Sequence, residues 1–383
     1  MPSLIPQDLT GPGTHGLVIG VSHYLHMAGG SDPTDLATAF DMEQLSAAAR
    51  SASEFAAWLL TEYKCARAPL RSLRVLLSPA DGEQIEPGIA ALLAGDSSAS
   101  LSNVREALLE FRQACDAHTD NVAMVYIAGH GVQLTKHGAI VLLTDFGARD
   151  QVTALERAVD VAGVHAGMNH PGTASTQFWF VDACRQQPSI MRRFETLRGG
   201  LQLDVRPGDS EVSPIFLAAT TGKPAYARVG GITLFNEALM WSLRGGAAVA
   251  PEEGGTEAWH VSVSALIHAL PRRVKELAYV EGADQSADIA GKTLEATVHE
   301  FSAVPEVDLC IHLTPSEAEN VARATLKRDD RTVFRNARTW PVRRKVEAGL
   351  YYLTVSARAP YAKRATGINA LPPEKHVPVD VTP

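Results

Sequence analysis

Cysteine is scarce in this sequence. Only four of its 383 residues are cysteines, Cys65, Cys115, Cys184 and Cys310, and they lie far apart with no C-x-x-C pair. The histidines do not cluster at metal-ligand spacing along the sequence either. The sequence therefore predicts neither a disulfide framework nor a metal site, and no cofactor is expected.

Runs of positive charge and long apolar runs are also lacking. The net charge is −8 and the 35 Lys and Arg residues are scattered, which argues against nucleic acid or an anionic membrane as a partner. No stretch of 18 uninterrupted apolar residues occurs, and the N-terminus has no signal-peptide pattern. We therefore expect a cytoplasmic protein that acts on a protein or a small molecule.

The apolar content that is present comes in short runs. Hydrophobic residues make up 45% of the chain, which is enough for one large domain and a smaller one. Five runs lack the alternation of a half-exposed strand and are typical of strands buried on both faces of a parallel sheet. They are residues 16–21, 73–78, 122–128, 178–182 and 214–219. A short extra strand is predicted at 139–143.

Helical patterns lie between these runs. An apolar stripe from Leu45 to Leu59 predicts one helix. Asn103 with Glu106, and Thr153 with Glu156, have the spacing of helix starts and predict two more. Strands and helices in alternation predict an α/β fold, a mostly parallel sheet flanked by helices.

Beyond residue 245 the pattern changes. Residues 262–277 read as a helix with a break at Pro271, and residues 300–357 read as a small C-terminal β-rich domain. The Pro-rich residues 358–383 are expected to form an extended tail. The main domain is expected to span residues 14–280.

Reactive side chains follow two of the predicted strands. The third strand ends in A-G-H-G, which contains His130, and the fourth ends at Asp182 and Cys184. Carboxyl ends of parallel strands share one edge of a sheet, so an imidazole and a thiol are expected at the same edge. Histidine is the side chain suited to deprotonate a thiol near neutral pH. The N–H groups of Gly131 and Cys184 could stabilise an oxyanion.

A structural role has to be weighed for each of these residues. A lone cysteine is more often a small hydrophobic residue, and this is our interpretation of Cys65, Cys115 and Cys310. A lone histidine in a turn is also mostly structural. The joint occurrence of His130 and Cys184 at two strand ends favours catalysis instead.

The motifs V-Y-I-A-G-H-G and F-W-F-V-D-A-C-R-Q resemble those of the caspase and metacaspase cysteine peptidases. The resemblance spans roughly residues 14–280. It implies that His130 is the base, that Cys184 is the nucleophile and that Gly131 and Cys184 supply the oxyanion donors. The implied reaction is hydrolysis of peptide bonds in protein substrates through an acyl-enzyme.

The resemblance also suggests substrate-binding residues. Asp182 stands where metacaspases keep an acid that pairs with a basic P1 residue, the residue before the scissile bond, and this favours Arg or Lys at P1. Asp182 could instead cap a helix or anchor a loop. Tyr226, Ala227 and Arg228 fall in the loop that flanks the substrate. Arg228 lies near the caspase arginine that binds a P1 Asp, but it could also pair with Asp182 or point away.

Two family features are missing. The N-D-A of the first helix is replaced by Arg50, Ser51 and Ala52, which removes a second acid from the pocket. The acidic insertion that binds calcium in many metacaspases is also lacking, and Asp145 has few acidic neighbours in sequence. We therefore expect activity without calcium.

The segment from Arg185 to Ser213 corresponds to the caspase linker in which maturation cleavage occurs. If P1 is basic, it contains four candidate self-cleavage sites, Arg192, Arg193, Arg198 and Arg206. The alternative is a solvated loop.

Two other functions remain open at this point. One is a catalytically silent caspase-like scaffold that binds a partner, and the other is a thiol acyltransferase or hydrolase that is not a peptidase. The β-rich domain is a candidate surface for a regulatory protein partner. Family analogy suggests a bacterial stress, cell-death or defence effector.

Overall fold

The chain forms two compact units in the computed structural model of the protein. One comprises Met1–Met240 and Ser262–Glu300, and the other comprises Trp241–Val261 and Phe301–Pro383. The structure describes residues 4–5, 9–133, 138–170, 172–185, 200–205, 210, 212–228, 230–252 and 258–383. The first unit contains a mostly parallel sheet with helices, and the second contains the β-rich region.

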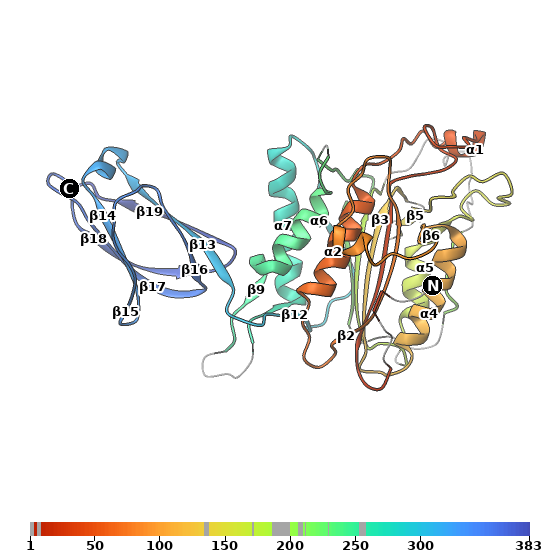
Figure 1. The fold of residues 1–383 in the computed structure, drawn as a ribbon, viewed down its shortest axis with the longest axis horizontal. Coiled ribbons are helices and arrows are strands. Elements are labelled where there is room, and N and C mark those ends of the chain that lie inside the picture. Colours follow the sequence, from red (N-terminus) through yellow and green to blue (C-terminus); the bar gives the residue numbers. More distant parts are fainter. Residues whose placement is uncertain are drawn as a thin grey trace. The chain divides into compact units, whose positions relative to one another are not determined.

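A six-stranded sheet forms the centre of the first unit (Figure 1), with the strand order β11-β8-β7-β3-β1-β2. Five strands of this sheet, β1, β2, β3, β7 and β8, are parallel, and β11 pairs antiparallel with β8 at one edge. Four of the five apolar runs lie wholly in these parallel strands, as predicted, and the run 214–219 extends two residues beyond β8. The strands are β1 (Thr14–Val21), β2 (Leu70–Ser78), β3 (Val122–Gly129), β7 (Thr176–Ala183), β8 (Ser213–Leu217) and β11 (Asp288–Lys292).

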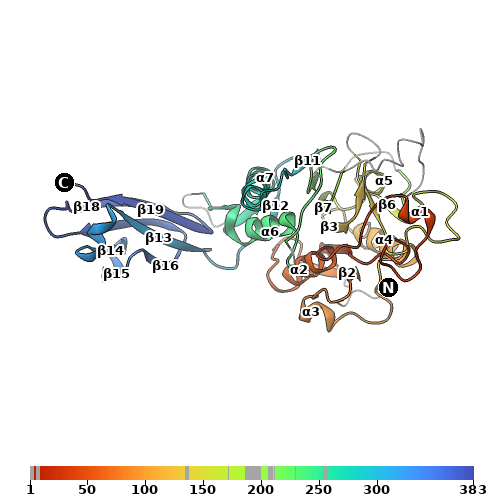
Figure 2. The ribbon, with the colours of Figure 1, turned by 90° about the horizontal axis from the view of Figure 1, so that it is seen from above.

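Helices cover both faces of this sheet. Figure 2 shows α2, α6 and α7 on one side and α4 and α5 on the other. Gly20 of β1 allows α2 to pack closely, because a Cβ there would lie 2.6 Å from Cβ of Ala52. The helices are α1 (Asp35–Thr38), α2 (Ala48–Thr61), α3 (Pro87–Ala90), α4 (Leu101–Cys115), α5 (Val161–Met168), α6 (Leu234–Trp241) and α7 (Val263–Val280).

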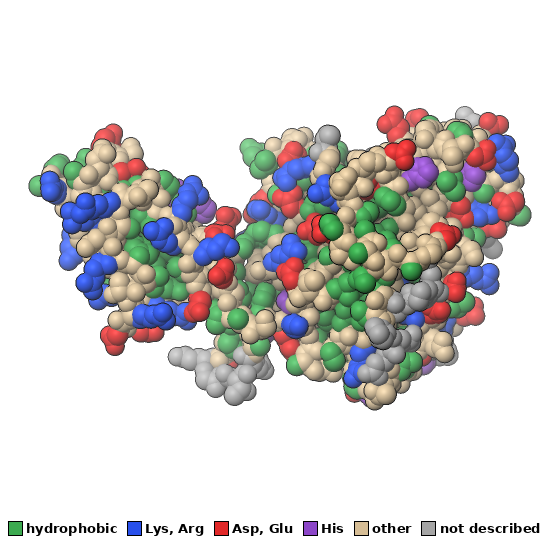
Figure 3. All heavy atoms as spheres, in the orientation of Figure 1, with side chains coloured by type: hydrophobic (Ala, Val, Ile, Leu, Met, Phe, Trp, Pro, Cys, Tyr) green, Lys and Arg blue, Asp and Glu red, His purple; other side chains and the backbone are tan. Residues whose placement is uncertain are grey.

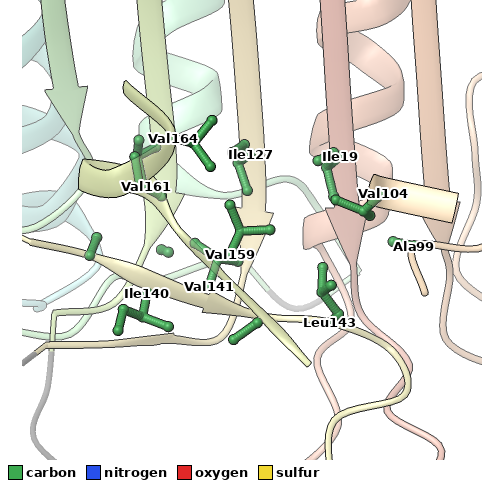
Figure 4. Close-up of a cluster of buried hydrophobic side chains, with 14 of the residues drawn as sticks. Ile19, Ala99, Val104, Ile127, Ile140, Val141, Leu143, Val159, Val161 and Val164 are labelled. Carbon is green, nitrogen blue, oxygen red and sulfur yellow. The ribbon is translucent and has the colours of Figure 1, made fainter. Parts of the chain in front are cut away.

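A small antiparallel sheet follows the carboxyl end of β3. It contains β4 (Gly131–Val132), β5 (Ile140–Leu142) and β6 (Ala158–Asp160), with β5 in the middle. The predicted short strand at 139–143 is therefore present as β5. Figure 4 shows Val141 and Val159 of this small sheet near Ile127 at the end of β3. These residues belong to one hydrophobic cluster, so the small sheet is fixed to the main sheet by apolar packing.

Three helix predictions need correction. The helix predicted to start at Thr153 begins at Val161, because residues 158–160 pair with β5 as β6 and the Asp160 side chain caps the helix by accepting the Gly163 N–H at 3.0 Å. The cap of α4 is Ser100 rather than Asn103.

The third correction concerns the break predicted at Pro271. Instead, α7 runs through Pro271 without interruption. Its buried side chains, such as Leu266, Leu270 and Val274, continue on both sides of the proline. Packing of this apolar face therefore outweighs the loss of one backbone hydrogen bond.

The second unit is a β sandwich. A three-stranded sheet, β16-β13-β19, and a four-stranded sheet, β15-β14-β17-β18, enclose one hydrophobic cluster. The strands are β13 (Glu306–Thr314), β14 (Arg323–Arg328), β15 (Arg331–Ala337), β16 (Val342–Glu347), β17 (Gly349–Ser356), β18 (Arg364–Ala370) and β19 (Glu374–Asp380). Shorter elements are a π-helical turn (Ser242–Gly246), a 3₁₀ turn (Ser316–Asn320), β9 (Ala248–Val249), β10 (His260–Ser262) and β12 (Thr297–Glu300).

The expected extended tail at 358–383 was wrong. It contains β18 and β19, whose residues Ile368, Val377 and Val379 are buried in the sandwich. Their alternation of buried and exposed positions is the pattern of a strand with one face on a core. The prolines lie at turns and at an exposed position of β19, where they do not interrupt this pattern.

Charge differs along the chain. Residues 301–383 contain more Lys and Arg than Asp and Glu, so the net negative charge of the chain comes from residues 1–300. Figure 3 shows basic side chains gathered on the visible face of the sandwich and mixed with acidic ones elsewhere. Among the described residues, none of the helices is both long enough and apolar enough to cross a membrane.

Candidate active site

The register of the sheet brings His130 and Cys184 to the same level. β3 and β7 are parallel neighbours, and their last pair is Gly129 with Ala183. His130 and Cys184 are the next residues on the two strands. Adjacent strands lie about 4.8 Å apart, so both side chains start from the same edge of the sheet.

Gly131 lies directly against the backbone of Cys184. A Cβ at Gly131 would be 2.1 Å from the Cys184 carbonyl oxygen and 2.8 Å from Cβ of Ala183. Only glycine fits at this position. The Leu142 N–H donates to the His130 carbonyl at 2.9 Å, which makes Gly131 and Val141 a non-hydrogen-bonded pair. The Gly131 N–H therefore points away from β5, as an oxyanion donor requires.

The His130 imidazole is held in one orientation. Its Nε2 lies 2.6 Å from the Glu43 carbonyl oxygen, so Nε2 carries a proton and Nδ1 has the free lone pair. The His130 N–H donates to the Tyr24 hydroxyl at 2.7 Å, and the two rings lie 5.0 Å apart. Burial lowers the pKa of His130, although the Glu43 carbonyl partly opposes this. The imidazole is therefore neutral at neutral pH.

The Cys184 thiol is half-buried and is protonated at neutral pH. Burial raises its pKa, the charge of Asp182 raises it further, and a hydrogen bond from Ala225 lowers it. The Ala225 N–H donates to Sγ at 3.1 Å, and Sγ lies 3.7 Å from the Ala225 carbonyl oxygen. Within the described part of the chain, no hydrogen bond joins Sγ to His130.

Asp182 is a buried acid with one free oxygen. Its Oδ2 accepts hydrogen bonds from the Tyr126 hydroxyl, at 2.6 Å, and from the Thr233 hydroxyl. Its Oδ1 has no hydrogen-bond partner among the described residues. Burial raises the pKa of Asp182 to about 6, against the effect of the two hydroxyl groups. Asp182 does not cap a helix here.

Arg228 is occupied by other acids. Its guanidinium pairs with Glu237 and, at 2.6 Å, with Glu281. Arg228 does not pair with Asp182. The charge of Arg228 is therefore already balanced by two carboxylates, which disfavours its binding to an acidic P1 side chain.

One cavity contains most of the expected site residues. Its volume is about 410 Å³, and its lining includes His130, Gly131, Asp182, Cys184, Tyr226 and Ala227. Arg228 does not line it. Asp41 and Glu43 add two more acids, and no Lys or Arg occurs among the described lining residues. The cavity is therefore strongly acidic.

Ser51 supports Asp182 through Thr233. The Thr233 N–H donates to the Ser51 hydroxyl at 3.0 Å, and both residues are buried. The position that holds an acid in the family motif thus supplies a neutral hydroxyl, which orients the threonine that binds Asp182.

Asp145 is bound within the fold. Its carboxylate accepts the Leu101 N–H at 3.1 Å and pairs with Arg157 at 2.6 Å. The oxygens of this carboxylate are already occupied, which disfavours their use as calcium ligands.

Other expected residues cannot be placed. The four candidate self-cleavage residues, Arg192, Arg193, Arg198 and Arg206, lie outside the described part of the chain. Arg185, which follows Cys184, is buried and pairs with Asp288 of β11 at 2.7 Å.

The sequence interpretation missed the segment after β1. Tyr24, Asp41 and Glu43 all come from this segment and reach the same edge of the sheet. The sequence could have predicted this position, because β1 is parallel to β3 and the carboxyl ends of both strands lie at the same edge of the sheet. The contact made by Glu43 could not be read from its identity, since it uses a backbone carbonyl.

Comparison with known proteins identifies the family of the chain. A family model described as the caspase domain matches residues 15–296. No curated protein matches the chain.

Proposed function

The chain belongs to the caspase-domain family of cysteine peptidases, and from this premise we propose that it cleaves protein substrates after Arg or Lys, with Cys184 as nucleophile and His130 as base. The observation that carries the proposal is the shared cavity. A thiol, a neutral imidazole and a buried acid with a free oxygen all line it.

The proposed reaction begins with a proton transfer. The Cys184 thiol has to leave Ala225 before it can pass its proton to Nδ1 of His130, the ring nitrogen with the lone pair. The thiolate then attacks the peptide carbonyl carbon, and the N–H groups of Gly131 and Cys184 stabilise the oxyanion. His130 returns the proton to the leaving amine. Water then hydrolyses the thioester with His130 as base.

The acidic lining supports a basic P1 residue. A cationic side chain would be attracted by the charge of Asp182 and could bind its Oδ1 after a small movement exposes this buried atom. A P1 Asp would meet three acids and find Arg228 paired with two glutamates. A charge-assisted hydrogen bond to a buried carboxylate is strong and selective.

The same contact would activate the nucleophile. The charge of Asp182 raises the pKa of Cys184, although less than burial does. A P1 cation bound to Asp182 cancels that charge and makes the thiolate easier to form. We therefore infer that a basic P1 residue contributes to catalysis as well as to binding.

A fluorogenic peptide panel tests the proposal. Peptides with Arg, Lys, Asp, Leu or Ala at P1 are compared, with and without calcium. Arg and Lys peptides are expected to be cleaved with no calcium requirement, and Cys184→Ala is expected to be inactive. Asp182→Asn should lower kcat/KM for the Arg peptide roughly 30-fold or more, since truncating one partner of a buried charge pair typically costs about 2–5 kcal/mol.

The controls test the catalytic assignment separately from the P1 preference. Asp41→Asn removes an exposed acid of the same cavity and should have a much smaller effect. Cleavage after Asp would refute the pocket assignment alone. Failure of a peptidyl halomethyl ketone to label Cys184 would refute the catalytic assignment and favour a silent scaffold.

We also propose that the Arg-rich linker is processed by the peptidase itself. A basic P1 preference makes its arginines suitable sites. A band shift on storage should then disappear in Cys184→Ala, and a chain that stays intact while active would exclude processing.

A further inference from the structure

A cysteine and two histidines meet on the sandwich. Cys310 and His312 are two residues apart on β13, so their side chains lie on the same face of the strand. His376 of β19 is paired with Cys310 in the parallel ladder. Their neighbours Leu309 and Ile311 face the core. The three side chains therefore lie on the sheet face that is turned away from the core.

The three candidate ligand atoms converge. Sγ of Cys310 lies 3.2 Å from Nε2 of His312, and that nitrogen lies 3.4 Å from Nδ1 of His376. All three atoms lie within 4.8 Å of one another. A zinc ion with bonds of about 2.0–2.1 Å to nitrogen and 2.3 Å to sulfur separates tetrahedral ligands by roughly 3.3–3.6 Å. The two distances that involve Nε2 of His312 are close to this, and the third, from Sγ to Nδ1, is at most 4.8 Å.

Hydrogen bonds among these three side chains cannot account for all of their contacts. Nε2 of His312 is in contact with both Sγ and Nδ1, but one ring nitrogen has only a single proton or a single lone pair. Hydrogen bonding can therefore satisfy only one of its two contacts well. A cation at the centre would accept an electron pair from all three atoms.

The surroundings orient the outer histidine. Oε2 of Glu374 lies 3.6 Å from Nε2 of His376, the ring nitrogen that is not directed at the cluster. A carboxylate there favours the tautomer with its proton on Nε2 and its lone pair on Nδ1. Asp308 pairs with Glu374 in the ladder and adds a second negative charge nearby, while Arg343 of β16 pairs with Cys310 on the other side.

We propose that the C-terminal sandwich binds one Zn²⁺ ion through Sγ of Cys310, Nε2 of His312 and Nδ1 of His376. The Cys310 thiol gives up its proton to the solvent on binding, and water fills the fourth position. Sulfur and imidazole ligands favour zinc over magnesium or calcium. The ion would join β13 to β19, and this role is independent of the peptidase site.

Cobalt substitution in the full-length protein tests the sulfur ligand. The experiment uses the Cys184→Ala background, because Cys184 and His130 could themselves bind a metal. Added Co²⁺ should give the absorption of a thiolate-to-metal charge transfer. Cys310→Ser should abolish it. Cys65→Ser is the matched control, since both cysteines are 4% exposed, and it should leave the absorption unchanged.

Zinc binding tests the nitrogen ligands. His376 is exposed, so His376→Gln should fold normally and weaken Zn²⁺ binding by more than Glu374→Gln, for which a loss of roughly 10-fold is expected. Equilibrium dialysis should give one Zn²⁺ per chain, with no retention of Mg²⁺. Three results would each overturn the proposal: no zinc retained, cobalt absorption that survives Cys310→Ser, or unchanged zinc affinity in His376→Gln.

Discussion

At the scale of single residues, the charge of the buried acid Asp182 opposes folding, whereas the proposed function requires it. It is 3% exposed, and burial raises its pKa to about 6. Its free oxygen can bind a cation only when the carboxyl group is charged. The proposed substrate site would therefore depend on a charge that the folded protein disfavours.

This conflict predicts the pH dependence of stability. Because the pKa is higher in the folded state than in the unfolded chain, the folded state binds the proton more tightly. The contribution of Asp182 to stability should therefore fall as pH rises from about 4 to about 6. Over that range the free energy of unfolding of Asp182→Asn should rise relative to that of the wild type by on the order of 2–3 kcal/mol. Urea unfolding at several pH values measures the difference, and a difference that does not change with pH would contradict the assignment.

A second prediction concerns the thiol. Burial and then the charge of Asp182 raise the pKa of Cys184, and Asp182→Asn removes the second cause. The pH profile of Cys184 alkylation by iodoacetamide should move to lower pH in this variant. Asp41→Asn, which removes an exposed acid of the same cavity, should leave the profile in place. An unmoved profile in Asp182→Asn would show that the two groups do not interact.

The sequence was most informative where a side chain acts directly. The sequence predicted that His130, Asp182 and Cys184 lie close together, because each is at the end of an apolar strand or just after it, and parallel strands end at one edge. Glu43 acts through its backbone carbonyl, which every residue has, so its identity gave no signal. The pairing of Arg228 with Glu237 and Glu281 depends on distant segments and needed coordinates.

At the scale of elements, the close contact between β4 and the end of β7 makes Gly131 critical. Gly131→Ala would put a methyl group 2.1 Å from the Cys184 carbonyl oxygen and force the two segments apart. Displacement of reacting groups by about 1 Å can lower the rate 100-fold, so we expect a loss of kcat/KM of about that size or more. Gly88→Ala is the control, because nothing lies within 4 Å of its added Cβ. Near-normal kinetics in Gly131→Ala would contradict the described contact.

Elements were predictable where the pattern was long and apolar. The parallel strands met this condition. The prolines of residues 358–383 obscure the alternation of these strands in the sequence, although Val377 and Val379 face the core. Cys310 and His312 have the two-residue spacing of one strand face, but His376 is 64 positions away from His312. The cluster therefore became visible only through the pairing of β13 with β19.

At the scale of the whole molecule, each unit has its own hydrophobic cluster. Calorimetry of the full chain should therefore resolve two unfolding transitions. Saturating Zn²⁺ should raise the Tm of only the transition that belongs to the sandwich, because a ligand stabilises the unit that binds it. A single transition would show that the units unfold together. A zinc effect on both would show that they are thermodynamically coupled.

The register between β3 and β7 also limits how this protein can be recombined with its relatives. The side chains of His130 and Cys184 are level because β3 and β7 pair without a shift from Val122 with Thr176 to Gly129 with Ala183. Each of the two residues is therefore eight positions after the first pair. A one-residue deletion in either strand would turn the following side chain to the opposite face of the sheet. Such a chimera could keep a normal circular dichroism spectrum and still be inert. Gene shuffling should therefore exchange these two segments together, from the same parent.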